Sequence, residues 1–177
     1  MRVLFDHQIF SSQKYGGISR YFSELMKNFP VSHSFKLALI FSDNYYLNEK
    51  TSNFRTKNIL PDKRFKGKYF LKKRLYDLNQ CYSKFCISKN DFDLFHPTYY
   101  DNYFESVAKK PYVITVHDLI LFKFENYYNT PEVNKIKSQM LKSINNSRRI
   151  IAISQFTKND LVNTFGLNKE KIDIIYH

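Results

Sequence analysis

Two adjacent glycines, Gly16 and Gly17, are the residues of this chain whose position most clearly suggests chemistry. They follow an N-terminal apolar run, Val3–Phe5, and a short polar loop, and they precede a helical pattern of apolar residues. Exposed amide groups and the positive end of a helix dipole meet at such a junction, which favours an anionic phosphate. A tight turn that needs glycine for a positive φ angle would use the same two residues without any ligand.

A histidine and an aspartate, His117 and Asp118, directly follow Tyr112–Val116, a β-branched run typical of a strand that is buried on both faces. A histidine at a strand end can donate a hydrogen bond to a sugar hydroxyl or a phosphate, or can transfer a proton. Backbone groups at the strand end could equally satisfy its ring. Asp118 is too close in sequence to orient the His117 ring without a special turn.

Two other segments place candidate binding residues after predicted strands. Tyr99 lies in the segment His96–Tyr100, in which Pro97 ends a strand. Its ring could stack on the face of a sugar, although packing of the loop onto the core is the favoured interpretation. Ser154 follows the apolar run Arg149–Ile153 and is interpreted first as the N-cap of the next helix. Any contact of Ser154 with a ligand would come from the same helix N-terminus.

The sequence shows no pattern typical of a metal centre, so we expect no metal. None of the five histidines has a second histidine or a cysteine nearby in sequence. A Walker A lysine motif, a G-x-G-x-x-G fingerprint and a G-x-S-x-G elbow are all missing from the sequence. Cys81 and Cys86 lie inside a helical pattern, and we interpret them as reduced thiols of a cytoplasmic protein.

Strand-like runs alternate with helical patterns along the chain, which predicts an α/β fold with a doubly wound, mostly parallel, Rossmann-like sheet. The carboxyl ends of the strands then share one edge, and ligands bind beyond that edge. The polar residues that follow the strands therefore matter most, and Asp6 and His7 are among them. The predicted strands are Arg2–Phe5, Phe35–Phe41, Phe92–His96, Tyr112–Val116, Arg149–Ile153 and Ile172–Tyr176, and helices are expected to begin at Thr130-Pro131 and at Ser154.

The composition describes a basic, aromatic-rich globular chain. Its 177 residues include 28 Lys and Arg against 16 Asp and Glu, a net charge of +12, and 18% of them are aromatic. This composition excludes wholesale disorder and permits nucleic acid, an anionic membrane or phosphorylated substrates as partners. Lys63–Arg74 holds seven cations and no acid, interleaved with aromatic residues, which favours an anionic membrane surface. The apolar row Leu71, Leu75, Leu78, Tyr82 and Phe85 predicts a long amphipathic helix.

Taken in order, several of these segments resemble the N-terminal half of a family-4 glycosyltransferase of the GT-B fold. The resemblance extends nearly from end to end, and it rests on the order and spacing of the segments more than on any one of them. The segments are Asp6 at the end of the first strand, Tyr15–Tyr21, Phe95–Pro97 after Asp93, Val113–Leu119 and Ile151–Leu161.

The resemblance implies transfer of a sugar from a nucleotide-sugar donor to a glycan or lipid-linked acceptor, with retention of configuration and without a metal or other cofactor. The glycine loop would approach the donor phosphates, and His117 would contact the donor or stabilise the transition state. Arg20 and Tyr99 would contact the acceptor. The expected site thus comprises His117 as the catalytic residue, with Gly16, Gly17, Arg20, Tyr99, Asp118 and Ser154 as substrate-binding residues.

The same resemblance implies a second, donor-binding domain. Residues 1–177 would form a single acceptor-side domain, and they contain neither the Arg/Lys pair nor the paired glutamates that grip the donor in the family. We therefore expect these residues alone not to transfer sugar. Many family members act in cell-envelope polysaccharide synthesis, which implies a cytoplasmic protein that can sit on the inner membrane face.

Two other functions fit parts of the sequence. A basic, nucleic-acid-binding α/β module would explain the charge, but no recognised reader motif is present, so no nucleic acid is expected as a partner. Half of a sugar-nucleotide epimerase of similar two-domain architecture would explain the Rossmann-like pattern. An epimerised product, rather than a lengthened glycan, would distinguish that enzyme from a transferase.

Overall fold

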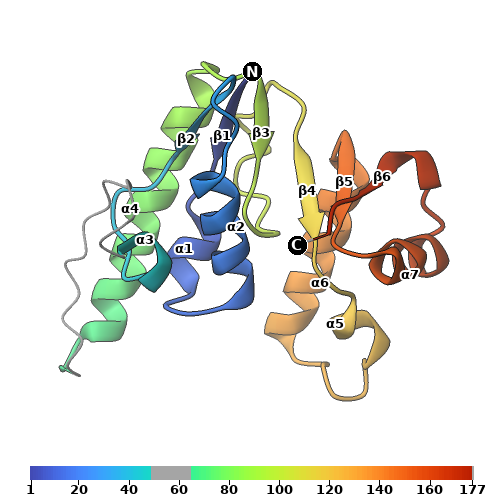
Figure 1. Ribbon diagram of the computed structural model, residues 1–177. Coiled ribbons are helices and arrows are strands. Elements are labelled where there is room, and N and C mark those ends of the chain that lie inside the picture. Colours follow the sequence, from blue (N-terminus) through green and yellow to red (C-terminus); the bar gives the residue numbers. More distant parts are fainter. Residues whose placement is uncertain (49–64, 177) are drawn as a thin grey trace.

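The computed structural model describes residues 1–48 and 65–176 (Figure 1). Strands and helices alternate along the chain, as the sequence pattern predicts. The strands are β1 (Arg2–Phe5), β2 (Ser34–Leu37), β3 (Leu94–His96), β4 (Val113–Val116), β5 (Arg149–Ala152) and β6 (Ile172–Ile174). The helices are α1 (Gln8–Ser12), α2 (Gly17–Lys27), α3 (Tyr45–Asn48), α4 (Lys68–Ser88), α5 (Ile120–Lys123), α6 (Pro131–Asn146) and α7 (Gln155–Phe165), with a short 3₁₀ helix, Lys169–Lys171, before β6.

The pairings between the six described strands are all parallel, which confirms the predicted α/β class. One sheet has the order β2-β1-β3 and the other has the order β4-β5-β6. An isolated parallel bridge between Phe95 and Tyr112 joins the two sheets, so the strands follow one another as in a single Rossmann-like sheet. The carboxyl ends of β1 and β4 point to the same edge, at the bottom of Figure 1.

Helices cover the two faces of the sheets unequally. The face that carries Leu4, Phe95 and Ile114 packs against α4 and α6, and α7 completes this layer over β5 and β6. On the opposite face, Val3 and Phe5 of β1 pack against Phe22 and other apolar residues of α2. Because α2 lies over the β1 half only, the same face of β4, β5 and β6 is left open beside it (Figure 1).

Local signals fix the ends of the later helices. Thr130 caps α6 by accepting a hydrogen bond from the backbone N–H of Val133 at 3.3 Å, and Pro131 occupies the first helical position. Gly166 ends α7 with a φ angle of 63°, a left-handed conformation that glycine adopts without a steric penalty. The start of α6 agrees with the sequence prediction.

The predictions are wrong or imprecise in the first 48 residues. The segment after β1 forms a short buried helix, α1, rather than the expected polar loop. The second strand, β2, ends at Leu37 and not at Phe41, because Ile40 and Phe41 donate their backbone N–H groups to the Asn79 side chain of α4. The segment that follows β2 includes the short helix α3 at 45–48.

Asp6 and His7 are buried in the core rather than presented at the ligand-binding edge, where their position after β1 had placed them. The Asp6 carboxylate accepts hydrogen bonds from the backbone N–H and the hydroxyl of Thr98 at 2.8 and 2.6 Å, from Gln8 Nε2 at 2.7 Å and from the Tyr103 hydroxyl at 3.1 Å. Since α1 folds back over the end of β1, these groups join the β1 and β3 loops and do not face solvent.

Candidate functional site

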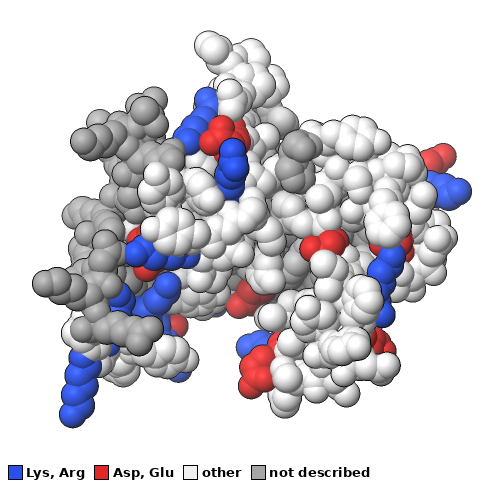
Figure 2. Space-filling view, turned by 60° about the horizontal axis from the view of Figure 1, so that its bottom comes forward, with Lys and Arg blue, Asp and Glu red and all other residues white. Residues whose placement is uncertain are grey.

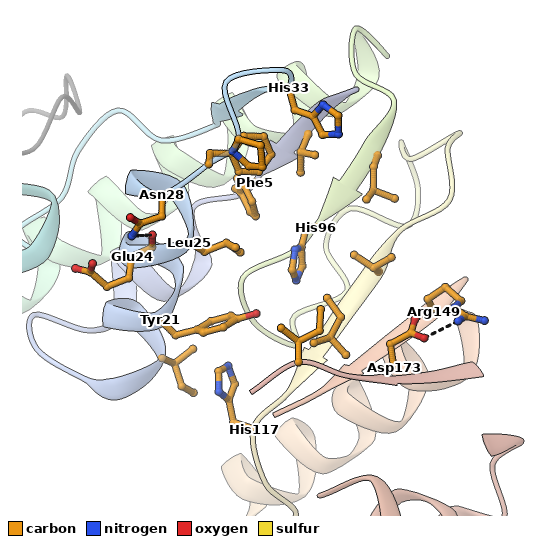
Figure 3. A pocket seen from close by; sticks show the side chains of 18 of the residues that line it. Phe5, Tyr21, Glu24, Leu25, Asn28, His33, His96, His117, Arg149 and Asp173 are labelled. Carbon is orange, nitrogen blue, oxygen red and sulfur yellow. Dashed lines mark hydrogen bonds and ion pairs between the residues drawn. The ribbon is translucent and has the colours of Figure 1, made fainter. Parts of the chain in front are cut away.

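A cavity of about 1220 Å³ occupies the open half of the sheet face, between α2 and the strands β4–β6 (Figure 3). Its walls are mainly apolar, with Phe5 and Leu25 on one side and Ile151 on the other. Polar residues line several parts of it: Arg20, Glu24 and Asn28 on the α2 side, His33, the Arg149–Asp173 ion pair on β5 and β6, and the two histidines His96 and His117. Arg149 is the first residue of β5, so the ion pair lies toward the amino ends of the strands, whereas His117 follows β4 at the carboxyl edge.

A smaller cleft of about 250 Å³ adjoins this edge. It is lined by Tyr99 and Asp118, and by Ile18 and His117, which also line the larger cavity. The rest of its lining is mainly apolar, so Tyr99, His117 and Asp118 are its polar groups together with Tyr100. His117 thus stands where the two spaces meet, and a molecule bound there could extend into both.

The glycine pair opens α2 without the backbone strain of a tight turn. Gly16 is extended, with a φ angle of 170°, and Gly17 begins the helix. Neither glycine therefore adopts the left-handed conformation that the tight-turn interpretation requires. A Cβ atom on Gly16 would lie 2.2 Å from Oε1 of Gln13, the oxygen that accepts a 3.4 Å hydrogen bond from the Ser19 N–H. A Cβ atom on Gly17 would meet nothing within 4 Å. Gly17 therefore leaves space open directly beside the first amides of the helix.

His117 is half-buried and is held from two sides. Its backbone carbonyl accepts a hydrogen bond from the Thr157 hydroxyl of α7 at 3.2 Å. Its ring packs edge-on against Tyr21 of α2, with 5.2 Å between the ring centroids and an interplanar angle of 84°. In Figure 3 the Tyr21 and His117 side chains point toward one another across the edge of the cavity. The structure therefore brings the imidazole to the same rim as the first turn of the helix that the glycines open.

His96 lies deeper in the same cavity wall. Burial, with a smaller contribution from the neighbouring His117, lowers the pKa of His96 from its ordinary 6.5 to about 3. The ring is therefore neutral near pH 7. A hydrogen bond of 2.9 Å joins His96 Nε2 to the Thr115 hydroxyl of β4 and so connects the two sheets.

Acidification is expected to destabilise the fold through His96. Because its pKa is lowered by folding, the unfolded chain binds a proton between about pH 6.5 and pH 3 that the folded chain does not. The contribution of His96 to the free energy of unfolding is therefore fully present above pH 6.5. It falls by roughly 3 kcal/mol as the pH drops to about 4. Burial lowers the pKa of His7 as well, which acts in the same direction.

Urea unfolding of the wild type and of His96→Asn, measured near neutral pH and in mild acid, tests this expectation. The variant should lose much less stability on acidification. The matched control is His33→Asn, since His33 is exposed, and its pH dependence should equal that of the wild type. An unchanged pH dependence in His96→Asn would show that other groups control acid unfolding.

The residues predicted for the site divide into two groups. Gly17 and Arg20 line the larger cavity, Tyr99 and Asp118 line the smaller cleft, and His117 lines both. Gly16 and Ser154 line neither of these two spaces. Gly16 makes room for the Gln13 side chain, and Ser154 acts as the N-cap of α7, accepting a hydrogen bond from the Thr157 N–H at 3.0 Å.

Tyr99 and Asp118 have local structural roles as well. Tyr99 is half-buried and packs against two of the apolar cores, as the favoured interpretation of its loop expects, and it still contributes to the cleft wall. The exposed Asp118 carboxylate accepts a hydrogen bond from the Ile120 N–H at 3.0 Å and so caps the following turn. That contact holds the carboxylate at the start of α5.

Tyr21, His96 and Thr115 belong to the site although they were not among the predicted site residues. Tyr21 lies one helical turn after Gly17, so the spacing alone could have placed it on the same side of α2. Thr115 is a polar residue inside an apolar strand, and alternation puts it on the face opposite Ile114. The pairing of Thr115 with His96 depends on strand order, which a single sequence does not reveal.

Comparison with known proteins identifies the family of this chain. The model of Glycosyltransferase Family 4 matches residues 15–177, a region that begins just before the paired glycines and includes every element from α2 onward. A comparison with curated proteins gives no match. The family match and the parallel α/β architecture agree with the resemblance carried by the sequence motifs. The chain belongs to glycosyltransferase family 4.

Proposed function

We propose that this chain forms the acceptor-side half of an enzyme that transfers a sugar from a nucleotide-sugar donor to a glycan or lipid-linked acceptor. The observation that carries the proposal is the position of His117, which lines both cavities next to the first turn of α2. The family match supports glycosyl transfer in general. The choice of donor class, acceptor class and stereochemistry rests on the chemistry of this edge and on the resemblance.

The edge supplies groups suited to a diphosphate leaving group. Negative charge grows on the leaving phosphate as the glycosidic bond breaks, and fixed donors that face this charge lower the barrier. The N-terminal amides of α2 beside Gly17 are such donors. His117 donates a hydrogen bond to the donor sugar or to the developing charge, and Arg20 and Tyr99 contact the acceptor, as the resemblance implies.

We further propose retention of the anomeric configuration, a reaction without metal, and a second domain that grips the donor. Among the described residues, the edge offers the amides of α2 and the imidazole of His117, and these would contact only one side of a nucleotide diphosphate. Fixed cations facing the other side would come from that second domain. Residues 1–177 alone would then bind a donor weakly and would not turn it over. The resemblance also supports a cytoplasmic reaction that contributes to cell-envelope polysaccharide.

The test uses protein expressed from its complete coding sequence. It is incubated with a panel of radiolabelled nucleotide sugars and with lipid and glycan extracts of the source cells, with and without a chelator. We expect label to enter a larger acceptor from one of the donors, to do so in the presence of the chelator, and to show the donor's anomeric configuration by NMR. An epimerised sugar nucleotide without any new glycosidic bond would support the epimerase instead. Lack of reaction with every donor would refute the proposal.

A further inference from the structure

Helix α4 has apolar residues on both its buried and its exposed side. The buried side is mixed, because the polar Asn79 and Ser83 lie there with Leu75, Cys86 and Ile87. The Asn79 side chain bonds to the N–H groups of Ile40 and Phe41 at 3.1 and 3.0 Å and to the Phe41 carbonyl at 2.7 Å, and Ser83 lies 2.6 Å from the Tyr103 hydroxyl. A surface helix ordinarily keeps its large apolar residues on the buried side, so those on the exposed side of α4 call for a reason.

The outward face carries a stripe of exposed, mostly apolar residues that we call the outer row: Phe70, Arg74, Leu78, Cys81 and Phe85. These positions follow one another by three or four residues, so they form one stripe along the helix. Phe70, Leu78 and Phe85 are 62%, 52% and 53% exposed, although Leu78 and Phe85 belong to the apolar row from which the helix was predicted. Tyr69 beside the row is 85% exposed. Large apolar side chains in one exposed stripe indicate a surface that another body covers.

The charges around the outer row have one dominant sign. Residues 66–89 contain seven Lys and Arg and a single acid, Asp77. Two of the cations lie over the exposed rings: the Arg74 guanidinium is 5.0 Å from the centre of Phe70, and Lys89 Nζ is 4.7 Å from the centre of Phe85. Figure 2 shows Lys and Arg gathered at the left of the view, on the side where α4 begins. Lys63 and Arg64 of the basic segment lie outside the described residues.

We propose that α4 lies flat on an anionic lipid surface, with its outer row in the boundary between head groups and acyl chains. Exposed Phe, Tyr and Leu side chains enter that boundary, and the flanking Lys and Arg reach the lipid phosphates. No helix in the described parts of the chain is long and apolar enough to cross a membrane. The proposal extends the contact from the basic segment to the full length of α4, and it does not depend on the reaction that the protein catalyses.

The apolar side chains of the outer row favour lipid over nucleic acid as the partner of α4. A nucleic-acid surface would need cations and stacking rings, whereas Leu78 has no partner in a phosphate backbone or a base stack. The position of the helix also suits a lipid-linked substrate. α4 begins at the edge where β1 and β4 end, the edge that carries the candidate site, and runs to the opposite edge (Figure 1).

Vesicle sedimentation of the purified chain tests the proposal. Vesicles of phosphatidylcholine containing about one quarter phosphatidylglycerol should carry the protein into the pellet, and vesicles of phosphatidylcholine alone should not. Lys73→Ser with Arg74→Ser should weaken the partition coefficient about thirtyfold. Leu78→Ser with Phe85→Ser should weaken it about tenfold. All four side chains are exposed, so circular dichroism and thermal melting should match the wild type.

The controls carry the same chemical changes on the far side of the molecule. Tyr127→Ser with Phe156→Ser removes two exposed rings, and Lys135→Ser with Lys169→Ser removes two exposed cations. Neither pair should change vesicle binding by more than about twofold. Equal losses in these controls would show that binding depends on overall charge or apolarity and would overturn the proposal. Equal sedimentation with both vesicle types, no sedimentation, or displacement of the vesicles by a single-stranded oligonucleotide would overturn it as well.

Discussion

Replacing His117 with alanine should lower kcat of the protein expressed from its complete coding sequence by about a hundredfold to a thousandfold, with a much smaller change in KM. The imidazole stands where the two cavities meet, and in the proposed reaction its loss removes a donor at the point where charge develops. The side chain is half-buried and its ring packs against the exposed side of the core, so the variant should fold normally. The measurement is the initial rate of label transfer, with thermal melting as a check on folding.

His33→Ala is the matched control for this prediction. His33 also lines the larger cavity, but it lies at the end remote from His117 (Figure 3). Its replacement should leave kcat within about twofold of the wild type, because it touches no group of the candidate site. If His117→Ala kept its rate within about fivefold, the reaction would have to be carried by other residues of the edge.

Replacing the buried Asp6 with alanine should lower the free energy of unfolding by about 3 kcal/mol or more. Its carboxylate accepts hydrogen bonds at 2.6 to 3.1 Å from Thr98, Gln8 and Tyr103. Gln8 Nε2 and the Tyr103 hydroxyl have second partners in the Asp101 carbonyl and Ser83, so the buried N–H of Thr98 loses most. The same bonds tie the loop after β1 to the loop after β3. Urea unfolding of the variant, followed by circular dichroism, gives the loss directly.

Asp118→Ala provides the comparison, because it removes an exposed carboxylate that accepts one local hydrogen bond at 3.0 Å from the Ile120 N–H. Its cost should stay below about 1 kcal/mol. Asp6→Asn should fall between the two, since the amide keeps one acceptor oxygen. An Asp6→Ala variant as stable as Asp118→Ala would mean that the neighbouring donors find other acceptors, and the network would then be dispensable.

Much of the fold is predictable from the sequence because its signals are local. Two of the strands, Arg2–Phe5 and Arg149–Ala152, stand out as largely apolar runs. Helix ends are marked by the capping residues next to them, which are Thr130, Ser154 and Gly166. The five-residue helix α1 escapes prediction because it is too short to show a periodicity. The burial of Asp6 escapes it because the partners Thr98 and Tyr103 are 92 and 97 residues away in the chain.

The candidate site is predictable in part for the same reason. The motif order places Gly17 and His117 at strand ends, and parallel strands bring such ends to one edge. Periodicity also predicts the helix α4, but it cannot tell which side of that helix faces the core. Asn79 decides this by bonding to the chain after β2, a contact across 38 and 39 residues that leaves Leu78 and Phe85 outside.

The bridge between Phe95 and Tyr112 joins two halves of the molecule, and each half carries part of the candidate site. Gly17 and Tyr21 belong to the half built on β1, whereas His117 follows β4 in the other half. The His96–Thr115 hydrogen bond and the Tyr21–His117 ring contact also cross this boundary. A rotation of one half against the other would break these contacts, so the spacing between the imidazole and the amides of α2 depends on the stiffness of the central sheet.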